Sequence, residues 1–428
     1  MKKQLTFAIA GLGSRGYYSY ASILKNVPDD AKLVAVAEPR PEMMKICREN
    51  FDLPDDMCFE TAEELLKKDK LADVLVIATL DRMHYLQAIA ALEKGYDLLL
   101  EKPISINPAE CKKIADVANR LGRKVVVCHV LRYTPFYKAL KKLIDEGAIG
   151  KIMSIQAMER VSFWHQAHSF VRGNWRNSNT TSSMILQKCC HDMDIYLWLA
   201  GKNCKTVSSF GNLSYFTKEN APEGATEHCS EKCSKFDTCV YNPYHYYGNR
   251  LKSGSFDWPL NVVIPKPDEK LLDEALKTGP YGKCVFLTDN NVVDHQVVNL
   301  LLEDDVTVSF TMCAFTATSG RKLLLMGTEG HIDGFMEDNY IKLCRFGEEE
   351  KVIDIGELGE DVMGHGGGDS RMVYSLIDML RDGKVDSSIT TIDRSVESHY
   401  VAMAAEESRI NGGMAIDIND YIKSIPNL

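Results

Sequence analysis

Two clusters of basic side chains have the residue types needed to move a proton. Lys102 stands in the tripeptide Glu101-Lys102-Pro103, directly after a short apolar run. A lysine whose pKa is lowered by burial or by nearby cations exchanges a proton with a hydroxyl group that is being oxidised. In the second cluster, His191 lies three residues after Lys188 and three before Asp194. On a helix these side chains share one face, and an imidazole suits proton transfer near neutral pH.

The spacing therefore predicts Lys102, His191 and Lys188 as catalytic residues. Two simpler interpretations stay open, namely Lys102 as a solvated surface charge and His191 as a structural histidine bonded to Asp194. The proline that follows Lys102 restricts the backbone there, which argues against an ordinary surface lysine.

A segment from residue 163 to 176 mixes aromatic rings with hydrogen-bond donors. Aromatic rings cover the C–H faces of a sugar while histidine and arginine bind its hydroxyl groups, and arginine also suits a phosphate or carboxylate. An irregular surface loop is the alternative, although so many aromatic side chains are costly to leave in water. A second segment, 365–369, leads into a predicted helix, where Asp369 either contacts the substrate or caps the helix. The predicted substrate residues are Trp164, His165, His168, Arg172, Trp175, Asp194, His365 and Asp369.

The apolar run Leu5–Ala10 leads into Gly11-Leu12-Gly13-Ser14-Arg15-Gly16, the pattern of a phosphate-binding turn between a strand and a helix. The first glycine permits the sharp turn, the second lets backbone N–H groups approach a pyrophosphate, and the third lets the helix pack closely on the sheet. A second predicted strand, Lys32–Ala37, ends at Glu38, where a carboxylate holds a ribose 2′-hydroxyl. The combination predicts a dinucleotide site that favours NAD over NADP, although Arg40 can pair with a 2′-phosphate. A glycine turn in an unrelated α/β domain is the alternative.

Strand and helix patterns alternate over the first 130 residues, which predicts a parallel, doubly wound sheet with its ligand at the carboxyl ends of the strands. After Arg132 the pattern changes to an α+β arrangement with a large, mostly antiparallel open sheet. We therefore predict two domains, 1–132 and 133–428, with a long polar insertion at about 214–290 that is either functional or disordered. The expected strands are Leu5–Ala10, Lys32–Ala37, Ala72–Ala78, Asp97–Leu100, Lys124–His129, Lys151–Glu159, Thr206–Leu213, Val292–Glu303, Val306–Phe315, Lys322–Thr328 and Ile332–Glu337. The expected helices are Tyr17–Asn26, Pro41–Asn50, Ala62–Asp69, Arg82–Gly95, Pro108–Leu121, Pro135–Glu146, Met372–Asp382 and Arg394–Ile410, with turns at Glu303–Asp305 and Thr328–Gly330.

The composition excludes some classes of partner. The chain has 428 residues and a formal net charge of -10, which argues against nucleic acid, and no apolar stretch approaches the ~20 residues of a membrane span. Its 13 cysteines are scattered along the chain, which favours reduced thiols in the cytoplasm over a disulfide framework. Cys229, Cys233 and Cys239 offer three thiolates to a structural zinc ion, although their spacing is irregular and partly buried thiols without metal are favoured.

The glycine loop, Glu101-Lys102-Pro103, the Arg132–Pro135 junction and the helix with His191 and Asp194 together resemble the Gfo/Idh/MocA oxidoreductase family, the group of glucose-fructose oxidoreductase and inositol dehydrogenase. The resemblance spans almost the whole chain. It implies an N-terminal Rossmann domain, a C-terminal α/β domain, and assembly of a homo-oligomer, a dimer or tetramer, through the open sheet. It also implies NAD(P)-dependent redox chemistry on a sugar, polyol or glycoside.

Residue by residue, the resemblance implies that Lys102 and His191 take the positions of the family's catalytic lysine and histidine. Residues 78–81 and His84 match its cofactor-contacting segment, with Leu80 where proline is usual. Glu101 is suited to bind the nicotinamide ribose. The predicted cofactor-binding residues are Gly11, Gly13, Ser14, Arg15, Gly16, Glu38, Arg40, Thr79, Leu80, Asp81, His84, Glu101, Lys102 and Arg132.

One departure from the family's pattern concerns the substrate. The family often has an aspartate four residues before the histidine, where this sequence has Gln187 followed by Lys188. A lysine there lowers the pKa of Lys102 or His191 if it lies close to either. The departure resembles members that act on the C3 hydroxyl of glycosides, including redox-dependent glycosidases.

The function expected from the sequence is hydride transfer between NAD and a sugar or glycoside hydroxyl at C3. One alternative is a glycosidase with tightly bound NAD, which oxidises C3 transiently, eliminates the aglycone, adds water and reduces the ketone again. Another is a non-catalytic sensor that binds nucleotide, although the presence of both Lys102 and His191 argues against it.

Overall fold

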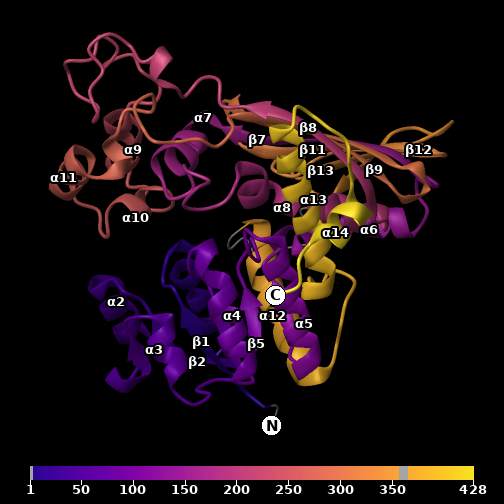
Figure 1. Ribbon diagram of the computed structural model, residues 1–428, viewed down its shortest axis with the longest axis horizontal. Helices are drawn as coiled ribbons and strands as arrows, with labels where there is room; N and C mark the ends of the chain where they lie inside the picture. Colours follow the sequence, from indigo (N-terminus) through magenta and orange to yellow (C-terminus); the bar gives the residue numbers. More distant parts are fainter. Residues whose placement is uncertain (1–2, 356–364) are drawn as a thin grey trace.

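The first sheet is built from strands that are apolar on both faces. All four residues of β4 (Val74–Ile77) are buried, as expected for a parallel strand covered by helices on both sides. The computed structural model describes residues 3–355 and 365–428, and it arranges six parallel strands in the order β3-β2-β1-β4-β5-β6 (Figure 1). The order steps outwards from β1 in both directions, so the predicted doubly wound sheet is confirmed. The other strands are β1 (Leu5–Ala10), β2 (Ala31–Ala37), β3 (Cys58–Phe59), β5 (Asp97–Leu100) and β6 (Val125–Val127).

The helices of this half begin and end at sequence signals. Helix α5 (Pro108–Leu121) starts where the Asn107 side chain accepts a hydrogen bond from the Ala109 N–H, and it ends at Gly122 with φ 63°, as predicted. The helix after the glycine loop starts three residues earlier than predicted, as the π-helix η1 (Ser14–Ala21) followed by α1 (Ser22–Lys25). The remaining helices are α2 (Pro41–Phe51), α3 (Ala62–Lys67) and α4 (His84–Glu93), with 3-10 turns at Asp55–Met57 and Asp81–Met83.

The second sheet has nine strands in the order β14-β13-β12-β11-β7-β10-β9-β8-β15. Its strand pairs are antiparallel except for β7 with β10, and the predicted turns at residues 303–305 and 328–330 join β9 to β10 and β11 to β12. Three strands were not predicted, namely β13, β14 and β15, because they have only two to six residues and carry too short an alternation to stand out. The strands are β7 (Ile152–Ser162), β8 (Cys204–Asn212), β9 (His295–Leu302), β10 (Thr307–Thr316), β11 (Gly320–Gly327), β12 (Gly330–Phe335), β13 (Tyr340–Arg345), β14 (Lys351–Asp354) and β15 (Ile416–Asp417).

The insertion between β8 and β9 carries three helices of its own. They are α9 (Pro243–Lys252), α10 (Leu260–Val263) and α11 (Glu269–Thr278), and they lie together beyond α7 (Phe163–His165), at the end of the molecule away from β12 (Figure 1). Tyr247, Leu260 and Leu276 form a small core among them. The sequence left open whether the insertion is functional or disordered. The structure shows an ordered segment with its own apolar packing, so the alternative of disorder is wrong.

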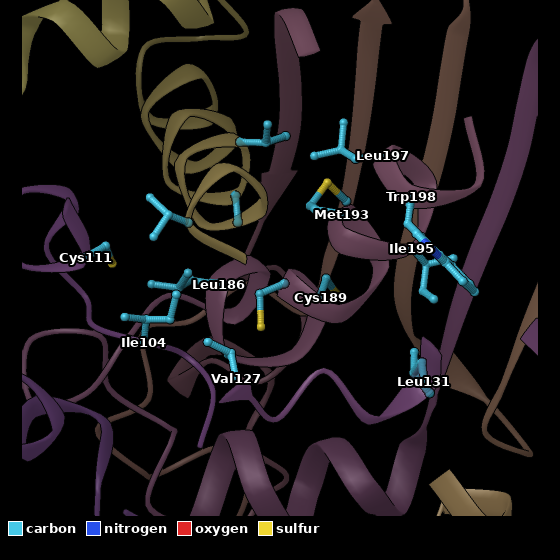
Figure 2. Close-up of a cluster of buried hydrophobic side chains, with 14 of the residues drawn as sticks. Ile104, Cys111, Val127, Leu131, Leu186, Cys189, Met193, Ile195, Leu197 and Trp198 are labelled. Atoms are coloured by element: carbon cyan, nitrogen blue, oxygen red, sulfur yellow. The ribbon is translucent and has the colours of Figure 1, made fainter. Parts of the chain in front are cut away.

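Helix α8 (Met184–Ala200) is buried along nearly its whole length between the two halves. It packs against α13 (Ile392–Ile410), and Figure 2 shows its Leu186, Cys189 and Met193 side by side in the shared core with Ile104 and Val127 from the first half. This burial explains why the helix is apolar on all sides apart from the few polar residues considered below.

The C-terminal part of the chain returns to the first sheet. Helix α12 (Gly368–Asp382) begins four residues before the predicted start and places Met372 and Leu376 in one core with Phe7 and Ile9 of β1. Ala8 and Ala10, on the opposite face of β1, belong to the other core. Among the described helices, none is long and apolar enough to cross a membrane. The remaining helices are α6 (Pro135–Asp145), α14 (Ile418–Ser424) and the π-helix η5 (Gln166–Arg172), whose buried residues make the alternative of an irregular surface loop there wrong, with 3-10 turns at Val130–Tyr133, Lys218–Asn220, Pro280–Gly282 and His365–Gly367.

Candidate functional site

The three glycines of the loop after β1 have different surroundings. A Cβ on Gly16 would lie 1.8 Å from the Gly11 carbonyl oxygen, and one on Gly11, whose φ is 88°, would lie 2.6 Å from the Ala78 carbonyl oxygen. A Cβ on Gly13 would meet no atom within 4 Å. Gly11 and Gly16 are therefore required by the chain itself, while Gly13 borders open space at the N-terminus of η1. That arrangement fits a dinucleotide whose pyrophosphate lies against the loop backbone.

Glu38, at the end of β2, is fixed beside this loop. One carboxylate oxygen accepts the Leu12 N–H at 2.7 Å, and the other accepts from Arg40 Nε at 2.6 Å. Burial opposes ionisation, but the hydrogen bonds from Arg40 and Leu12 outweigh it and hold the pKa of Glu38 below its usual value. The side chains of Glu38 and Arg40 thus form one pair at the position where an adenosine ribose lies in Rossmann folds.

The side chains of Arg15 and Asp369 contact each other in the structure. Arg15 Nε lies 2.6 Å from Glu101 Oε1, and its guanidinium also donates to Asp369 Oδ2 at 3.1 Å and to the Tyr20 hydroxyl at 2.7 Å. Asp369 is 1% exposed, and the N-cap of α12 is Gly367, so the alternative of Asp369 as the helix cap is wrong, while its substrate contact stays a prediction. These side chains instead tie η1, β5 and α12 together in a buried charge network.

The side chain of His365 lies outside the described part of the chain. In the segment 79–84, three of the predicted cofactor-binding side chains have partners within the protein. The Thr79 hydroxyl donates to Gln87 at 2.7 Å, the His84 ring nitrogens lie 2.8 Å and 3.1 Å from two carbonyl oxygens, and Asp81 accepts from Ser182 at 2.6 Å. These groups hold the loop, while Leu80 is 46% exposed and open to contact.

Lys102 follows β5 and reaches across to α8. Its Nζ donates to the Gln187 carbonyl oxygen at 2.9 Å. Burial lowers the pKa of Lys102, and the positive charges of Lys188 and Arg15 lower it further against the opposing effect of Glu101. The position where the family pattern often has an aspartate thus contributes its backbone carbonyl, and Lys188 lies close enough to act on Lys102.

Lys188 is held by a carboxylate that the sequence analysis missed. Its Nζ lies 3.2 Å from Glu159 Oε1, and Arg321 bridges Glu159 and Asp192 at 3.0 Å and 2.9 Å. Burial, partly opposed by Arg321, raises the pKa of Asp192 to about 6. The pairs join α8 to two distant strands, so no local spacing could have revealed them.

Asp194 is paired with Arg132. Both oxygens of Asp194 accept from Arg132, each at 2.6 Å, and the pair is buried with the Arg132 guanidinium 5.4 Å from the Trp198 ring. The structure thus places Asp194 and Arg132 in one buried pair, and the contacts predicted for them with substrate and cofactor stay predictions.

The predicted substrate segment divides into two groups. Arg172 donates to the carbonyl oxygens of Lys283 and Tyr241 at 2.7 Å and 2.6 Å, and His168 Nδ1 lies 2.6 Å from the Tyr247 hydroxyl. His168 and Arg172 are buried and anchor the insertion, and their contacts with a sugar stay a prediction.

Trp164, His165 and Trp175 stay partly exposed. Trp258 of the insertion lies 4.9 Å from the His165 ring and 5.4 Å from the Trp164 ring, and the Tyr246 ring stacks on Trp164 at 5.5 Å. Burial, and then the charge of Lys188, lower the pKa of His165, which puts this aromatic group beside the lysines. The sequence signal that we overlooked is the aromatic density of the insertion around Tyr246 and Trp258.

The zinc prediction is not supported by the structure. All 13 cysteines are free thiols. Over residues 3–355 and 365–428, no three His, Cys, Asp or Glu side chains are grouped to hold a metal ion, so Cys229, Cys233 and Cys239 form no such site.

Comparison with known proteins adds two matches to family models. Residues 5–129 match an oxidoreductase family with an NAD-binding Rossmann fold, GFO_IDH_MocA, and residues 141–416 match the C-terminal α/β domain of the same family. The chain is 22% identical over 383 residues to the Bacillus subtilis protein named as oxidoreductase YteT, which covers 86% of this chain and 87% of that protein.

Two further similarities come from other members. A 2,7-anhydro-N-acetylneuraminate hydratase of Mediterraneibacter gnavus is 24% identical over 266 residues, covering 61% of this chain and 65% of that protein. The crystal structure of the WlbA dehydrogenase of Bordetella pertussis, in complex with NADH and UDP-GlcNAcA, superimposes with a TM-score of 0.69 at 16% identity, over 97% of this chain and 98% of that one. This last similarity concerns the fold.

Proposed function

The chain belongs to the Gfo/Idh/MocA family of NAD-binding oxidoreductases, and from this premise we propose that it transfers a hydride between NAD and the C3 carbon of a sugar or glycoside. The observation that carries the proposal is the Lys102 amine. It is buried, its pKa is lowered, and it is held by the Gln187 carbonyl oxygen of α8, the helix that also carries Lys188 and His191. An amine with a lowered pKa at a strand end beside the dinucleotide loop suits proton transfer from a hydroxyl group.

The residues of the chain divide the work as follows. When bound, the nicotinamide exchanges a hydride with the substrate carbon. Neutral Lys102 accepts the proton of the reacting hydroxyl during oxidation and returns it during reduction. His191, three residues along α8 from Lys188, shares this proton, while Glu159 keeps Lys188 in place to hold the pKa of Lys102 low.

The same geometry supports a choice of NAD over NADP. The Glu38 carboxylate is ionised and fixed beside the loop, where it binds the hydroxyl groups of the adenosine ribose. Arg40 is already paired with Glu38, so a 2′-phosphate would meet a carboxylate.

We propose that the sugar ring lies against the partly exposed rings of Trp164, His165 and Trp175. Trp258 completes this wall from the insertion of the same chain. The rings cover the apolar face of a sugar, and the two lysines lie at its polar edge.

A second candidate is favoured by one observation. The similarity to a 2,7-anhydro-N-acetylneuraminate hydratase is similarity to an enzyme whose name describes no net oxidation. A ketone formed transiently at C3 would acidify the hydrogen at C2. Loss of that proton would eliminate the aglycone from C1, water would add to the resulting double bond, and the NADH formed in the first step would reduce the ketone again. Such a glycosidase would need the same Lys102 and His191.

One assay separates these functions. Purified protein is incubated with NAD and a panel of aryl glycosides, and the absorbances of NADH and of released phenol are recorded together. NADH without phenol supports the dehydrogenase, and phenol released catalytically without net NADH supports the glycosidase. Neither signal, with NAD binding intact, contradicts both and leaves a nucleotide-binding sensor. Lys102→Met is the matched control, because it should lose either signal while it still binds NAD.

A further inference from the structure

Three buried histidines lie in a row behind the proposed catalytic residues. The His129 ring packs edge-to-face against His191 on one side, with centroids 5.5 Å apart, and against His399 on the other, at 5.4 Å. His129 and His399 are 0% exposed. His129 follows β6, His191 lies on α8 and His399 on α13, so the row joins three elements that are far apart in the sequence.

His399 has a single tautomer. Its Nδ1 lies 2.8 Å from the Ser395 carbonyl oxygen, which can only accept, so Nδ1 carries the hydrogen. Nε2 is therefore an acceptor, and the Ile104 N–H donates to it at 2.9 Å. Burial lowers the pKa of His399 to about 3, so the ring keeps this neutral form near pH 7.

This hydrogen bond fixes the backbone two residues after Lys102. The amine of Lys102 is fixed separately, by the Gln187 carbonyl oxygen on α8. Lys102 is thus held at both ends, its backbone by α13 and its Nζ by α8. Because Lys102 must present its amine to a small reacting group, a loss of either contact displaces the amine from its working position.

His129 acts through its shape. Neither of its ring nitrogens has a hydrogen-bond partner in the described part of the chain. Burial, and then the charges of Arg132 and Lys102, lower its pKa, so the ring is neutral. What His129 contributes to its neighbours is an aromatic spacer between His399 and His191.

We propose that His399 is a positioning residue for Lys102, and that the His129 ring, packed between His399 and His191, keeps Lys102 and His191 in register. This proposal rests on the proposed function, in which Lys102 and His191 transfer the proton. It assigns no substrate contact to His399 or His129. The juxtaposition of three imidazoles and one backbone amide carries it.

The first test uses two substitutions of His399. His399→Phe keeps a ring but removes the acceptor, and His399→Gln keeps an oxygen that can accept from the Ile104 N–H. We expect His399→Phe to raise the hydrogen-exchange rate of the peptide containing Ile104 about tenfold. We expect it to lower kcat about 10- to 100-fold with little change in KM for NAD. His399→Gln should restore both readouts to within about threefold of the wild type.

Ser398→Ala is the matched control. It removes a buried hydrogen bond to the same Ser395 carbonyl without touching Ile104, and both readouts should stay unchanged. If His399→Phe leaves exchange and kcat unaltered, or if His399→Gln rescues neither, the positioning role is overturned. Hydrogen exchange at Ile104 is measured without turnover, so it tests the positioning of Lys102 independently of activity. A wild type that oxidises no sugar would overturn only the proposed function.

The second test separates the ring of His129 from its nitrogens. His129→Phe should keep kcat within about threefold of the wild type, and His129→Ala should lower it about tenfold or more, because only the latter opens space beside His191. NADH binding and circular dichroism confirm that each variant is folded. If His129→Phe loses as much activity as His129→Ala, the nitrogens matter and the spacer role is wrong.

Discussion

The amine of Lys102 makes a hydrogen bond to the Gln187 carbonyl oxygen, and charged side chains around it also act on its pKa. Burial and the neighbouring cations favour its neutral form, so the base is present at a lower pH than for an ordinary lysine. Its activity as a base rises as pH rises through the lowered pKa. The proposed reaction therefore depends on a side chain, Lys188, that need not touch the substrate.

Replacing Lys188 tests this dependence. Lys188→Met removes one charge that lowers the pKa of Lys102, so that pKa rises and the rising limb of the kcat–pH profile moves to higher pH. We expect kcat to fall several-fold at pH 7 and to recover at alkaline pH. Lys202→Met, which breaks only an exposed pair with Asp304, is the control and should leave the profile in place. An unshifted limb in Lys188→Met would show that Lys188 does not act on the base.

A second prediction concerns Glu38. Glu38→Ala removes the carboxylate that binds the ribose hydroxyls and frees Arg40 for a 2′-phosphate. We expect NAD to bind about tenfold more weakly, the effect of losing a hydrogen bond to a charged group, and the preference for NAD over NADPH and NADP to shrink or invert. Titrations of NADH and NADPH fluorescence measure it, with the exposed neighbour Glu42→Gln as control. An unchanged preference for NAD over NADP would show that Glu38 does not bind the ribose hydroxyl groups.

At the scale of single elements, the turn between β1 and η1 contains one glycine that the fold requires and another that we expect only cofactor binding to require. Gly16→Ala would place a Cβ 1.8 Å from a backbone oxygen, so we expect a clear loss of thermal stability, of a few kcal/mol. Gly13→Ala has room within the protein and should keep its melting temperature, but its Cβ enters the space proposed for the pyrophosphate and should weaken NADH binding. Differential scanning calorimetry and NADH titration on both variants check the contrast. Equal melting temperatures, or unimpaired NADH binding in Gly13→Ala, would contradict it.

Elements were predictable where their signals are local. The cap at Asn107 and the glycine at Gly122 bracket α5 in the sequence as they do in the structure. The turns at residues 303–305 and 328–330 were found for the same reason. Short strands such as β13 and β14 were missed because a few alternating residues among charged ones give little periodic signal.

The backbone positions of the site residues were predictable from the sequence, and their hydrogen-bonded and charged side-chain partners were less so. The glycine loop, Glu38 and Lys102 stand at strand ends, and position at a strand end follows from the order of elements. The carboxylate partners of Arg15 and the partners of Asp194 and Arg172 lie 62 or more residues away along the chain. Such pairs depend on how elements pack, which no spacing in the sequence encodes.

At the scale of the whole molecule, the second sheet presents an apolar row that no described element covers. Phe210 of β8, Val297 of β9 and Met158 of β7 lie in one cross-strand row, with Thr311 of β10 between the last two, and are 53%, 37% and 39% exposed. Exposed apolar patches on a sheet are typical of association sites.

We therefore expect a homo-oligomer assembled through this face. The double variant Val297→Glu with Met158→Glu places charges in the row and should lower the molar mass measured by light scattering from two or four copies to one. Leu86→Glu, at a 71% exposed position on α4, is the control and should change nothing. A wild type that is already monomeric, or a double variant that stays assembled, would contradict the prediction.

The return of α12 to the first sheet sets a schedule for synthesis on the ribosome. Arg15 is made early, yet its partner Asp369 follows 354 residues later, and the core around Phe7 stays incomplete until Met372 and Leu376 appear. At 5–20 residues per second that interval lasts about 20–70 s. Through this period the nascent N-terminal half exposes the apolar face that α12 will cover, and the Arg15–Asp369 contact beside the nucleotide loop is still missing.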